Sequence, residues 1–400
     1  MPALFPTICM TQTVRLVEPA QREVERKHVV SMPGVPGDRI AVRPRDANGR
    51  ANDGIEMTWE RHSEASTATV IAPSHAAAPF ATDAASALEW LEAAPGAVLR
   101  ATRIAIVASE QDAEVLLASL AFQRDHLVSC RIGPTRIWSD FQLGADGYGR
   151  LLVAAGDILP ADLGRMIQRL QELGNYRNLA LLGLPLAQSE GVLLGDLEQR
   201  LGIITQQIAG ASEGTEAALL DELCDVSAKA AAIDTRTSFR MSATQAYAQI
   251  AHDRLASLPM NQIAGFQSLE DFTDRRMLPA VRTCASFVRR LEALSVRIER
   301  TTSLLRTRVD LATQASNVEL LKSMDANAAR QVKLQHLVEG LSVVAVSYYA
   351  FSLVAEALPM LTRLSGVGTD QLRAAIILPV IILVAFYLRW RARRVIGELD

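Results

Sequence analysis

The chain has 400 residues, of which 49% are hydrophobic and 21% are charged, and its formal net charge is −3. This length exceeds what one hydrophobic core normally organises, so more than one domain is expected. The small negative charge gives no attraction towards nucleic acid, which we exclude as a partner. The four scattered cysteines lack a C-x-x-C pair or a neighbouring histidine cluster, so they predict neither a zinc site nor a disulfide framework.

Residues 1–55 mix proline, glycine and charged residues, which predicts an irregular N-terminal arm. The arm lacks the cationic start and apolar core of a secretory signal, so the soluble part is expected to stay in the cytoplasm. Residues 56–157 contain short runs of alternating polarity between turn-forming residues, which predicts a small α/β or α+β domain. Strands are expected at 59–71, 102–108, 127–132, 135–143 and 149–154, and a helix at 82–93.

Beyond residue 157 the apolar spacing becomes helical, and residues 158–339 predict a helical domain. Neither glycine nor proline occurs between Pro279 and Gly340, which predicts a long stalk helix over 280–339. Such a helix cannot bury its apolar stripe alone, so we expect coiled-coil packing and a homo-oligomer. Earlier helices are expected from Asp157 or Pro160 to Gly183 and at 186–208, 215–258 and 269–277.

Two apolar runs near the C-terminus predict a transmembrane hairpin, because each is close to the ~20 residues that cross a bilayer. The hairpin covers 340–394, with membrane segments at 341–361 and 372–390 and a tail at 395–400. Arginines at 389–394, with Arg330 and Lys333, flank the outer ends of the hairpin, and its inner loop carries fewer cations. The positive-inside rule then predicts a multi-pass protein of a bacterial inner membrane with both termini cytoplasmic. A pair of buried core helices is the alternative, which these flanks disfavour.

A set of specific blocks runs from residue 59 to about residue 350. The blocks are Trp59-Glu60-Arg61-His62 with Glu64 and Ser66-Thr67, Gln168-Arg169-Leu170, Tyr176-Arg177, Ala180 to Pro185, Asp274-Arg275-Arg276, Leu304 to Asp310, Ser323-Met324-Asp325, Glu339 to Val343 and Ser347-Tyr348-Tyr349. Together they resemble the proteobacterial membrane proteins grouped as domain of unknown function 3422. The resemblance implies a membrane-associated protein and no assigned activity. The chain departs from that pattern at Ala65, Ala68 and Gly174-Asn175, and it lacks the family's N-terminal His-Ala-Arg-Pro block.

The order of a cytoplasmic α/β domain, a stalk helix and a two-helix hairpin is also similar to that of the bacterial magnesium channels. That family carries Gly-Met-Asn at the end of its first membrane helix. This chain reads Ala357-Leu358-Pro359-Met360-Leu361 at the corresponding place. An ion-channel interpretation therefore lacks its strongest marker.

One strand candidate carries chemistry. In an extended strand Glu60, His62 and Glu64 share one face, with neighbouring members about 6.6 Å apart. Two carboxylates beside an imidazole suit a divalent metal or acid–base catalysis. We favour the alternative of a polar face bonded to a neighbouring strand, because structural ion-pair networks look the same. No other cofactor is indicated, and no nucleophile elbow, P-loop or dinucleotide-binding glycine motif follows a strand.

Charged residues also gather on the first long helix, where Arg165, Arg169, Glu172 and Tyr176 share one face and Arg177 adds a cation. We favour a solvated or inter-subunit ion-pair face over a phosphate site for these residues.

The first membrane segment has a polar stripe, because Ser342, Tyr349, Ser352 and Glu356 fall within an arc of ~80°. Hydroxyl groups and an intramembrane carboxylate predict a helix–helix seam or a pore wall. For Glu356 the alternative is that its carboxylate simply reaches the headgroups from its position near the outer end.

The leading hypothesis from the sequence is a non-enzymatic, oligomeric inner-membrane protein with a cytoplasmic domain coupled to a two-helix hairpin. The alternative is an oligomeric ion or solute pathway formed by the hairpin. A third hypothesis is a metal-dependent enzyme at Glu60, His62 and Glu64.

Overall fold

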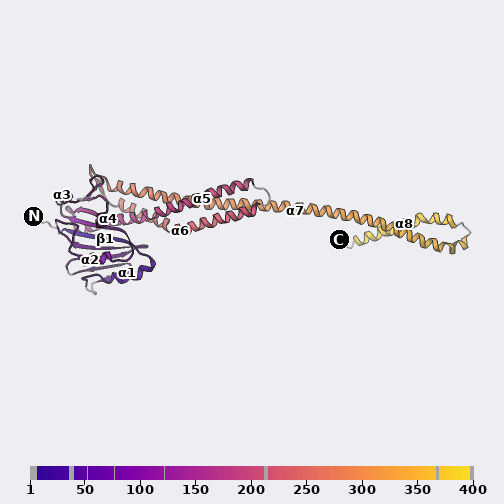
Figure 1. The fold of residues 1–400 in the computed structure, drawn as a ribbon, viewed down its shortest axis with the longest axis horizontal. Coiled ribbons are helices and arrows are strands. Elements are labelled where there is room, and N and C mark those ends of the chain that lie inside the picture. Colours follow the sequence, from indigo (N-terminus) through magenta and orange to yellow (C-terminus); the bar gives the residue numbers. More distant parts are fainter. Residues whose placement is uncertain are drawn as a thin grey trace. The chain divides into compact units, whose positions relative to one another are not determined.

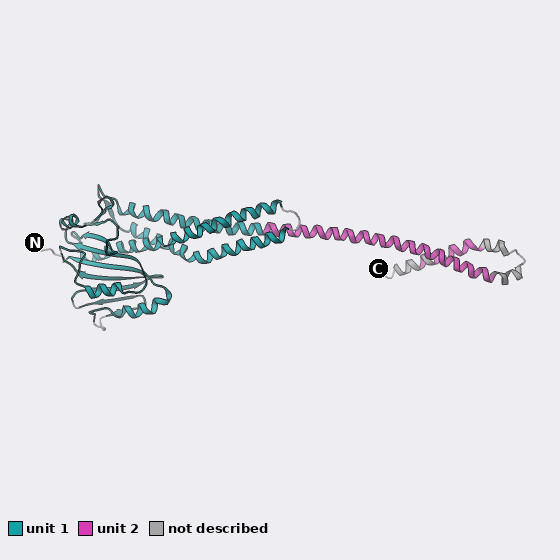
Figure 2. Ribbon diagram, viewed as in Figure 1, with its two compact units in different colours: residues 1–302 teal, residues 303–400 magenta. Residues whose placement is uncertain are grey.

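The computed structural model describes residues 7–35, 40–51, 53–75, 77–120, 122–210, 215–365 and 369–396. The chain divides into two compact units, Met1–Thr302 and Ser303–Asp400, which are coloured separately in Figure 2. The first unit combines a sheet with helices, and the second holds the rest of the longest helix and the last helix.

A ten-stranded sheet forms the body of the first unit, in the order β10-β7-β8-β9-β6-β1-β5-β4-β3-β2. Only β6 and β9 pair in parallel, and the other described pairs are antiparallel. The strands are β1 (Ile8–Leu16), β2 (Ala41–Val42), β3 (Asp46–Arg50), β4 (Glu56–Arg61), β5 (Ala65–Pro73), β6 (Ala97–Val107), β7 (Val128–Ile132), β8 (Thr135–Ser139), β9 (Gly149–Ala154) and β10 (Met260–Gln262). This mostly antiparallel pairing makes the unit an α+β fold.

The first strand of the chain lies in the middle of the sheet. β1 pairs along its whole length with β5, from Ile8 opposite Pro73 to Leu16 opposite Ala65, and its other edge pairs with β6. The structure therefore differs from the irregular arm expected over 1–55, which also contains α1 (Arg22–Val29), β2 and β3. The β-branched and apolar residues of β1 favour a strand locally, whatever the proline and glycine content of the whole stretch.

Helices cover both faces of the sheet (Figure 1). Alternate residues of β6 separate the faces, because Ile104 packs in one core and Ala105 in the other. α1, α2 (Ala85–Glu92) and α3 (Glu110–Ser119) lie on the Ala105 side, where Trp90 and Leu91 of α2 are buried. The opposite face packs against the longer helices that follow.

Four long helices and the last helix follow β9, and the short strand β10 lies between the third and the fourth of them. They are α4 (Pro160–Leu181), α5 (Gly183–Gly210), α6 (Glu216–Ala256), α7 (Leu269–Ser365) and α8 (Thr369–Ile396), with short 3-10 turns earlier at Pro19–Gln21 and Arg124–His126. Pro160 occupies the first turn of α4, where its missing N–H costs no hydrogen bond. α6 packs against both α4 and α5.

α7 joins three predicted elements into one helix. The helix expected at 269–277, the stalk at 280–339 and the apolar run at 341–361 are continuous, and Pro279 does not interrupt them. Ala280, Cys284 and Phe287 follow the proline and are 4%, 3% and 3% exposed. We attribute the unbroken helix to this burial, which offsets the one backbone hydrogen bond that proline cannot donate.

Ion pairs add to the apolar seam between the long helices of the first unit. Arg290 of α7 donates through Nε and Nη2 to the Glu198 carboxylate of α5, at 3.1 and 2.7 Å. Arg236 of α6 holds Glu190 of α5 in the same two-point way, at 3.0 and 2.8 Å. Such bidentate pairs fix the relative register of helices.

The second unit contains α7 beyond Thr302 and the described part of α8. Ser347 of α7 and Val384 of α8 are only 6% and 8% exposed. By length and composition, α7 contains a segment that is apolar enough to cross a membrane, and only 6% of that segment is buried. α8 contributes a shorter apolar stretch, Ile376–Tyr387. The expected N-terminal sheet domain and long C-terminal helix are thus confirmed.

Candidate functional site

A cavity of about 400 Å³ lies between α4 and the sheet, on the face opposite α1 and α2. We call it the α4 cavity. Its apolar part is lined by Ile8, Met10, Ile71, Ile106, Leu163 and Ile167. Its polar part contains Gln12, Thr58, Glu60, His62, Thr67, Thr69, Gln168, Gln171, Glu172, Asn175 and Tyr176. A volume of this size, with an apolar wall and convergent polar groups, is typical of small-molecule sites.

His62 lies at the polar end of the α4 cavity, directly after β4. Its Nε2 is 3.2 Å from Thr67 Oγ1, and its ring meets the Tyr176 ring edge-on at a centroid distance of 6.2 Å. Burial lowers the pKa of His62, and the negative charges of Glu60 and Glu172 partly oppose that shift. The imidazole is therefore neutral at pH 7, where it can both donate and accept a hydrogen bond.

Glu172 and Tyr176 come from one face of α4 and complete the polar end. Glu172 accepts a hydrogen bond from Gln168 at 3.0 Å, and Arg254 Nε of α6 lies 2.5 Å from its carboxylate. Tyr176 stacks on Tyr247 at 5.9 Å. Burial and the nearby Glu172 raise the pKa of Tyr176, so its hydroxyl stays protonated at neutral pH. This end of the cavity therefore offers hydrogen-bond donors and acceptors, and its two carboxylates, Glu60 and Glu172, outnumber the one described arginine, Arg254, that pairs with either of them.

The three residues proposed for a metal do not stay together. β4 ends at Arg61 and β5 begins at Ala65, so the single strand expected over 59–71 is interrupted by a turn. Glu60 and His62 line the α4 cavity, whereas Glu64 is paired with Arg240 of α6 through two hydrogen bonds. Among the described residues, no three His, Cys, Asp or Glu side chains gather closely enough to hold a metal ion.

A series of hydrogen bonds between buried amide side chains runs through the wall of the α4 cavity. It was not predicted from the sequence. Gln12 of β1 donates to Thr69 at 3.0 Å and accepts from Asn175 of α4 at 3.1 Å. Asn175 in turn accepts a hydrogen bond from Arg100 at 2.7 Å. Gln171, one turn earlier in α4, is 2% exposed, and neither atom of its amide has a partner. Buried amides of this kind are costly unless something bonds to them.

The predicted charged face of α4 is divided in the structure. Arg165 and Arg169 are exposed, and Arg165 pairs locally with Asp162. Glu172 and Tyr176 turn towards the α4 cavity. Arg177 is only 9% exposed and lies over the ring of Phe272 at 5.0 Å, on a different side of the helix.

Most of the predicted polar stripe of α7 is exposed in the structure. Tyr349 is 68% exposed, and Ser352 and Glu356 are also exposed, whereas Ser342 is half-buried. Ser347 and Phe351 are the more buried neighbours of the stripe. The stripe is therefore accessible on a single chain.

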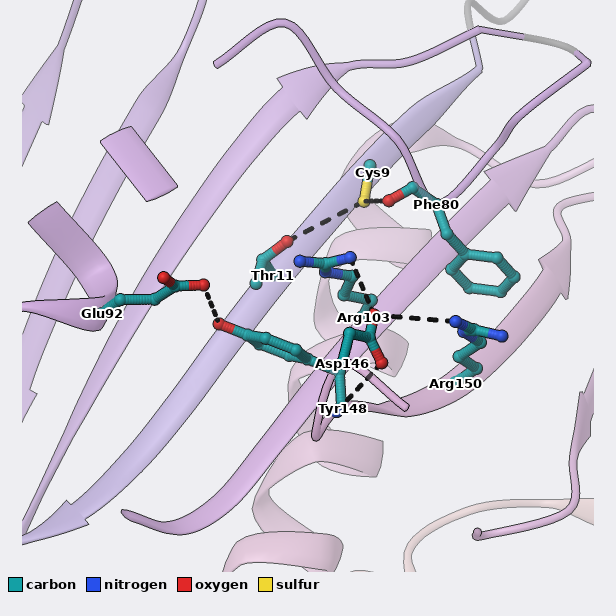
Figure 3. A network of polar contacts seen from close by, with 8 residues as sticks. All are labelled: Cys9, Thr11, Phe80, Glu92, Arg103, Asp146, Tyr148 and Arg150. Atoms are coloured by element: carbon teal, nitrogen blue, oxygen red, sulfur yellow. Dashed lines mark hydrogen bonds and ion pairs between the residues drawn. The ribbon is translucent and has the colours of Figure 1, made fainter. Parts of the chain in front are cut away.

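A separate polar network lies on the opposite face of the sheet and needs no ligand (Figure 3). Asp146 accepts from Arg103 at 2.9 Å and lies 3.6 Å from Arg150, while Tyr148 donates to Glu92 at 3.2 Å. The Arg103 guanidinium also covers the Tyr148 ring at 4.3 Å. Because the charges are matched within the network, we interpret it as structural.

Comparison with known proteins gives one family. The family model described as "Protein of unknown function (DUF3422)" matches residues 2–396, nearly the whole chain. No curated protein matches the chain.

Proposed function

This chain belongs to the DUF3422 family of proteins of unknown function, and we propose that it is an integral membrane protein whose soluble unit binds a small molecule. In this proposal the apolar parts of α7 and α8 form a hairpin in a bacterial inner membrane. The residues that precede the hairpin, and both termini, lie in the cytoplasm.

The observation that carries the membrane proposal is the exposed apolar surface of α7 and α8. Leu341, Val344 and Leu353 of α7 are 72%, 67% and 69% exposed, and Leu378 and Phe386 of α8 are 68% and 73% exposed. Soluble proteins rarely leave so large a continuous apolar surface in water, because its burial is worth roughly 25 cal/mol per Å². Lipid chains would cover it. The arginines after Tyr387 support a cytoplasmic C-terminus.

Assembly with further copies of the chain is proposed from the stalk part of α7. Leu304, Leu311, Val318 and Val332 recur at multiples of seven residues and are 59%, 61%, 51% and 52% exposed. A heptad spacing of apolar residues is the pattern with which helices pair with one another. A second copy is the occupant that this spacing favours.

Binding is favoured over catalysis at the α4 cavity. Its titratable groups, Glu60, His62, Glu172 and Tyr176, include no nucleophile activated by a neighbouring base. The separation of Glu64 from Glu60 and His62 also weakens the metal-enzyme hypothesis. An oligomeric pore remains the second candidate, favoured by the exposed polar stripe at Tyr349 and Ser352.

Cysteine cross-linking in native membranes tests membrane insertion and assembly together. The background carries Cys224→Ser, because Cys224 is exposed and the other three cysteines are buried. We expect Ser352→Cys to give a cross-linked species of twice the chain mass, because Ser352 lies on the accessible stripe. Phe351→Cys, at the adjacent and more buried position, is the matched control and should stay monomeric. Both variants should remain in the membrane pellet after washing with alkaline carbonate.

Two results would overturn the proposal. Release of the protein from the membrane by alkaline carbonate would show that α7 and α8 do not form a hairpin inserted in the bilayer. Cross-linking by Phe351→Cys and not by Ser352→Cys would exclude the stripe as the contact between copies, and with it the pore.

A further inference from the structure

A second cavity, of about 340 Å³, lies on the other side of the C-terminal half of α4, next to β6, β8, β9 and the beginning of α7. We call it the arginine cavity. Arg100, Arg150, Arg177 and Arg276 are among the residues that line it, and none of the described residues around it carries a carboxylate. The guanidinium of Arg150 belongs to the network on the opposite face of the sheet. Its apolar walls are formed by Leu99, Ile137, Leu151, Leu170, Leu173 and Leu269.

Only one of these arginines has an acidic partner among the described residues. Arg150 lies 3.6 Å from Asp146 in the network of Figure 3. Arg100 instead donates to the neutral Asn175 amide, and Arg177 and Arg276 lie over the Phe272 ring at 5.0 and 4.8 Å. Arg100, Arg177 and Arg276 therefore bring three positive charges to the cavity, with no counter-charge among the residues that the structure describes.

These charges repel one another. Burial lowers the pKa of Arg100 to about 9, and the positive charge of Arg177 contributes. Burial likewise lowers the pKa of Arg177 to about 10, with a contribution from Arg276. Both groups are still protonated at pH 7. Unpaired buried charges destabilise a fold, so a bound anion would stabilise this one.

Further features of the walls suit a ligand. Gln171 also lines this cavity. Its side chain is only 2% exposed, and its amide has no hydrogen-bond partner. Phe141 is the one described non-glycine residue with a positive φ, 52°, and its ring stacks on Phe272 at 4.1 Å beneath Arg177. Strained residues of this kind concentrate at binding sites. Gly174 leaves room for Arg100, since a Cβ there would lie 2.8 Å from its Cζ.

We propose that the arginine cavity binds a small soluble molecule that carries a phosphate monoester. Guanidinium groups bind phosphate through two parallel hydrogen bonds each, and they prefer it to a simple halide because of that geometry. Arg100, Arg177 and Arg276 supply the cationic donors, and Gln171 adds a neutral one. The leucine and isoleucine walls accommodate the apolar remainder of the ligand, and the volume suits a compact molecule.

Thermal unfolding of the full-length protein in detergent tests this site, with inorganic phosphate and phenyl phosphate as probes and sodium chloride at equal ionic strength as the reference. Both probes should raise the melting temperature above the chloride value, because a ligand stabilises the state that binds it. Phenyl phosphate should act at lower concentration, since its ring contacts the apolar walls. Isothermal titration then gives the dissociation constants.

Three variants locate the effect. Arg177→Gln and Arg276→Gln should each weaken binding of phenyl phosphate at least about tenfold, the effect of losing one charge-assisted contact. Arg276 is exposed, so its variant is expected to fold even if Arg177→Gln does not. Arg169→Gln removes the same charge from an exposed position of α4 outside the cavity and should bind as the wild type does. The proposal would be overturned if the phosphate probes raised the melting temperature no more than chloride does. It would also be overturned if the Arg276 and Arg169 variants lost the same affinity for phenyl phosphate.

Discussion

His62 provides a pH-dependent term in the stability of the sheet unit. Because burial lowers its pKa below the ordinary value of 6.5, the unfolded chain binds the proton more readily than the folded chain does. The stabilisation that comes from keeping His62 neutral is therefore fully present above the pKa of the unfolded chain, and it is lost as the pH falls below that pKa. His28, whose pKa is also lowered by burial, adds a term of the same sign.

We expect His62→Gln to reduce the fall in melting temperature between about pH 7.5 and pH 5.5, because the variant removes one group that must take up a proton on unfolding. The contribution of His28 should leave a residual fall. His252→Gln, at an exposed position of α6, is the control and should retain the wild-type pH dependence. An unchanged pH dependence in His62→Gln would show that the imidazole is as accessible to protons in the folded state as in the unfolded one.

Some residues of the two cavities could have been identified from the sequence. Leu163, Ile167, Gln171 and Asn175 recur every four residues, which places two amides on the apolar, sheet-facing side of α4. A polar residue within an apolar stripe is a signal for a buried site. Arg100 gives no such signal, because its place beside α4 depends on the pairing of β6 with β1 and on the missing side chain at Gly174.

At the scale of elements, Gly183 determines how closely the start of α5 approaches its neighbours. A Cβ at this position would lie 2.2 Å from Thr244 Oγ1 of α6 and 3.3 Å from Cys284 Sγ of α7. Gly183→Ala should therefore lower the free energy of unfolding by about 1–3 kcal/mol through overpacking, as measured by chemical denaturation.

Gly191→Ala in the same helix is the matched control. A Cβ at Gly191 meets nothing within 4 Å, so alanine should stabilise α5 by about 0.5–1 kcal/mol through its better helix propensity. Stabilisation by both substitutions would mean that α5, α6 and α7 do not meet closely at Gly183.

Local periodicity predicted most helices and strands of this chain. It failed where tertiary contacts determine where an element ends. The polar alternation of Glu60, His62 and Glu64 continues through the turn after β4, so the pattern alone cannot show that the strand ends. The antiparallel pairing of Arg61 with Ser66 reveals it. At Pro279 the error is the reverse, because the proline predicted a break between two helices and α7 continues through it. Burial of the following turn maintains the helix.

At the scale of the whole molecule, the sequence predicted a long C-terminal helix with an apolar segment, because length and apolar content are local properties. The second apolar stretch that the structure describes, Ile376–Tyr387, is shorter than the segment expected at 372–390. The sequence could not predict that the stalk and the first apolar run form the single helix α7.

The proposed membrane hairpin of the apolar parts of α7 and α8 is tested most directly by mapping which side of the membrane each end and the connecting loop occupy. A reporter fused before Met1 and another after Asp400 should both be cytoplasmic, because the arginines at 389–394 favour that side. An epitope inserted between Ser365 and Thr369 should be accessible only from the periplasm. A periplasmic reporter after Asp400, or a cytoplasmic epitope between the two helices, would contradict the hairpin.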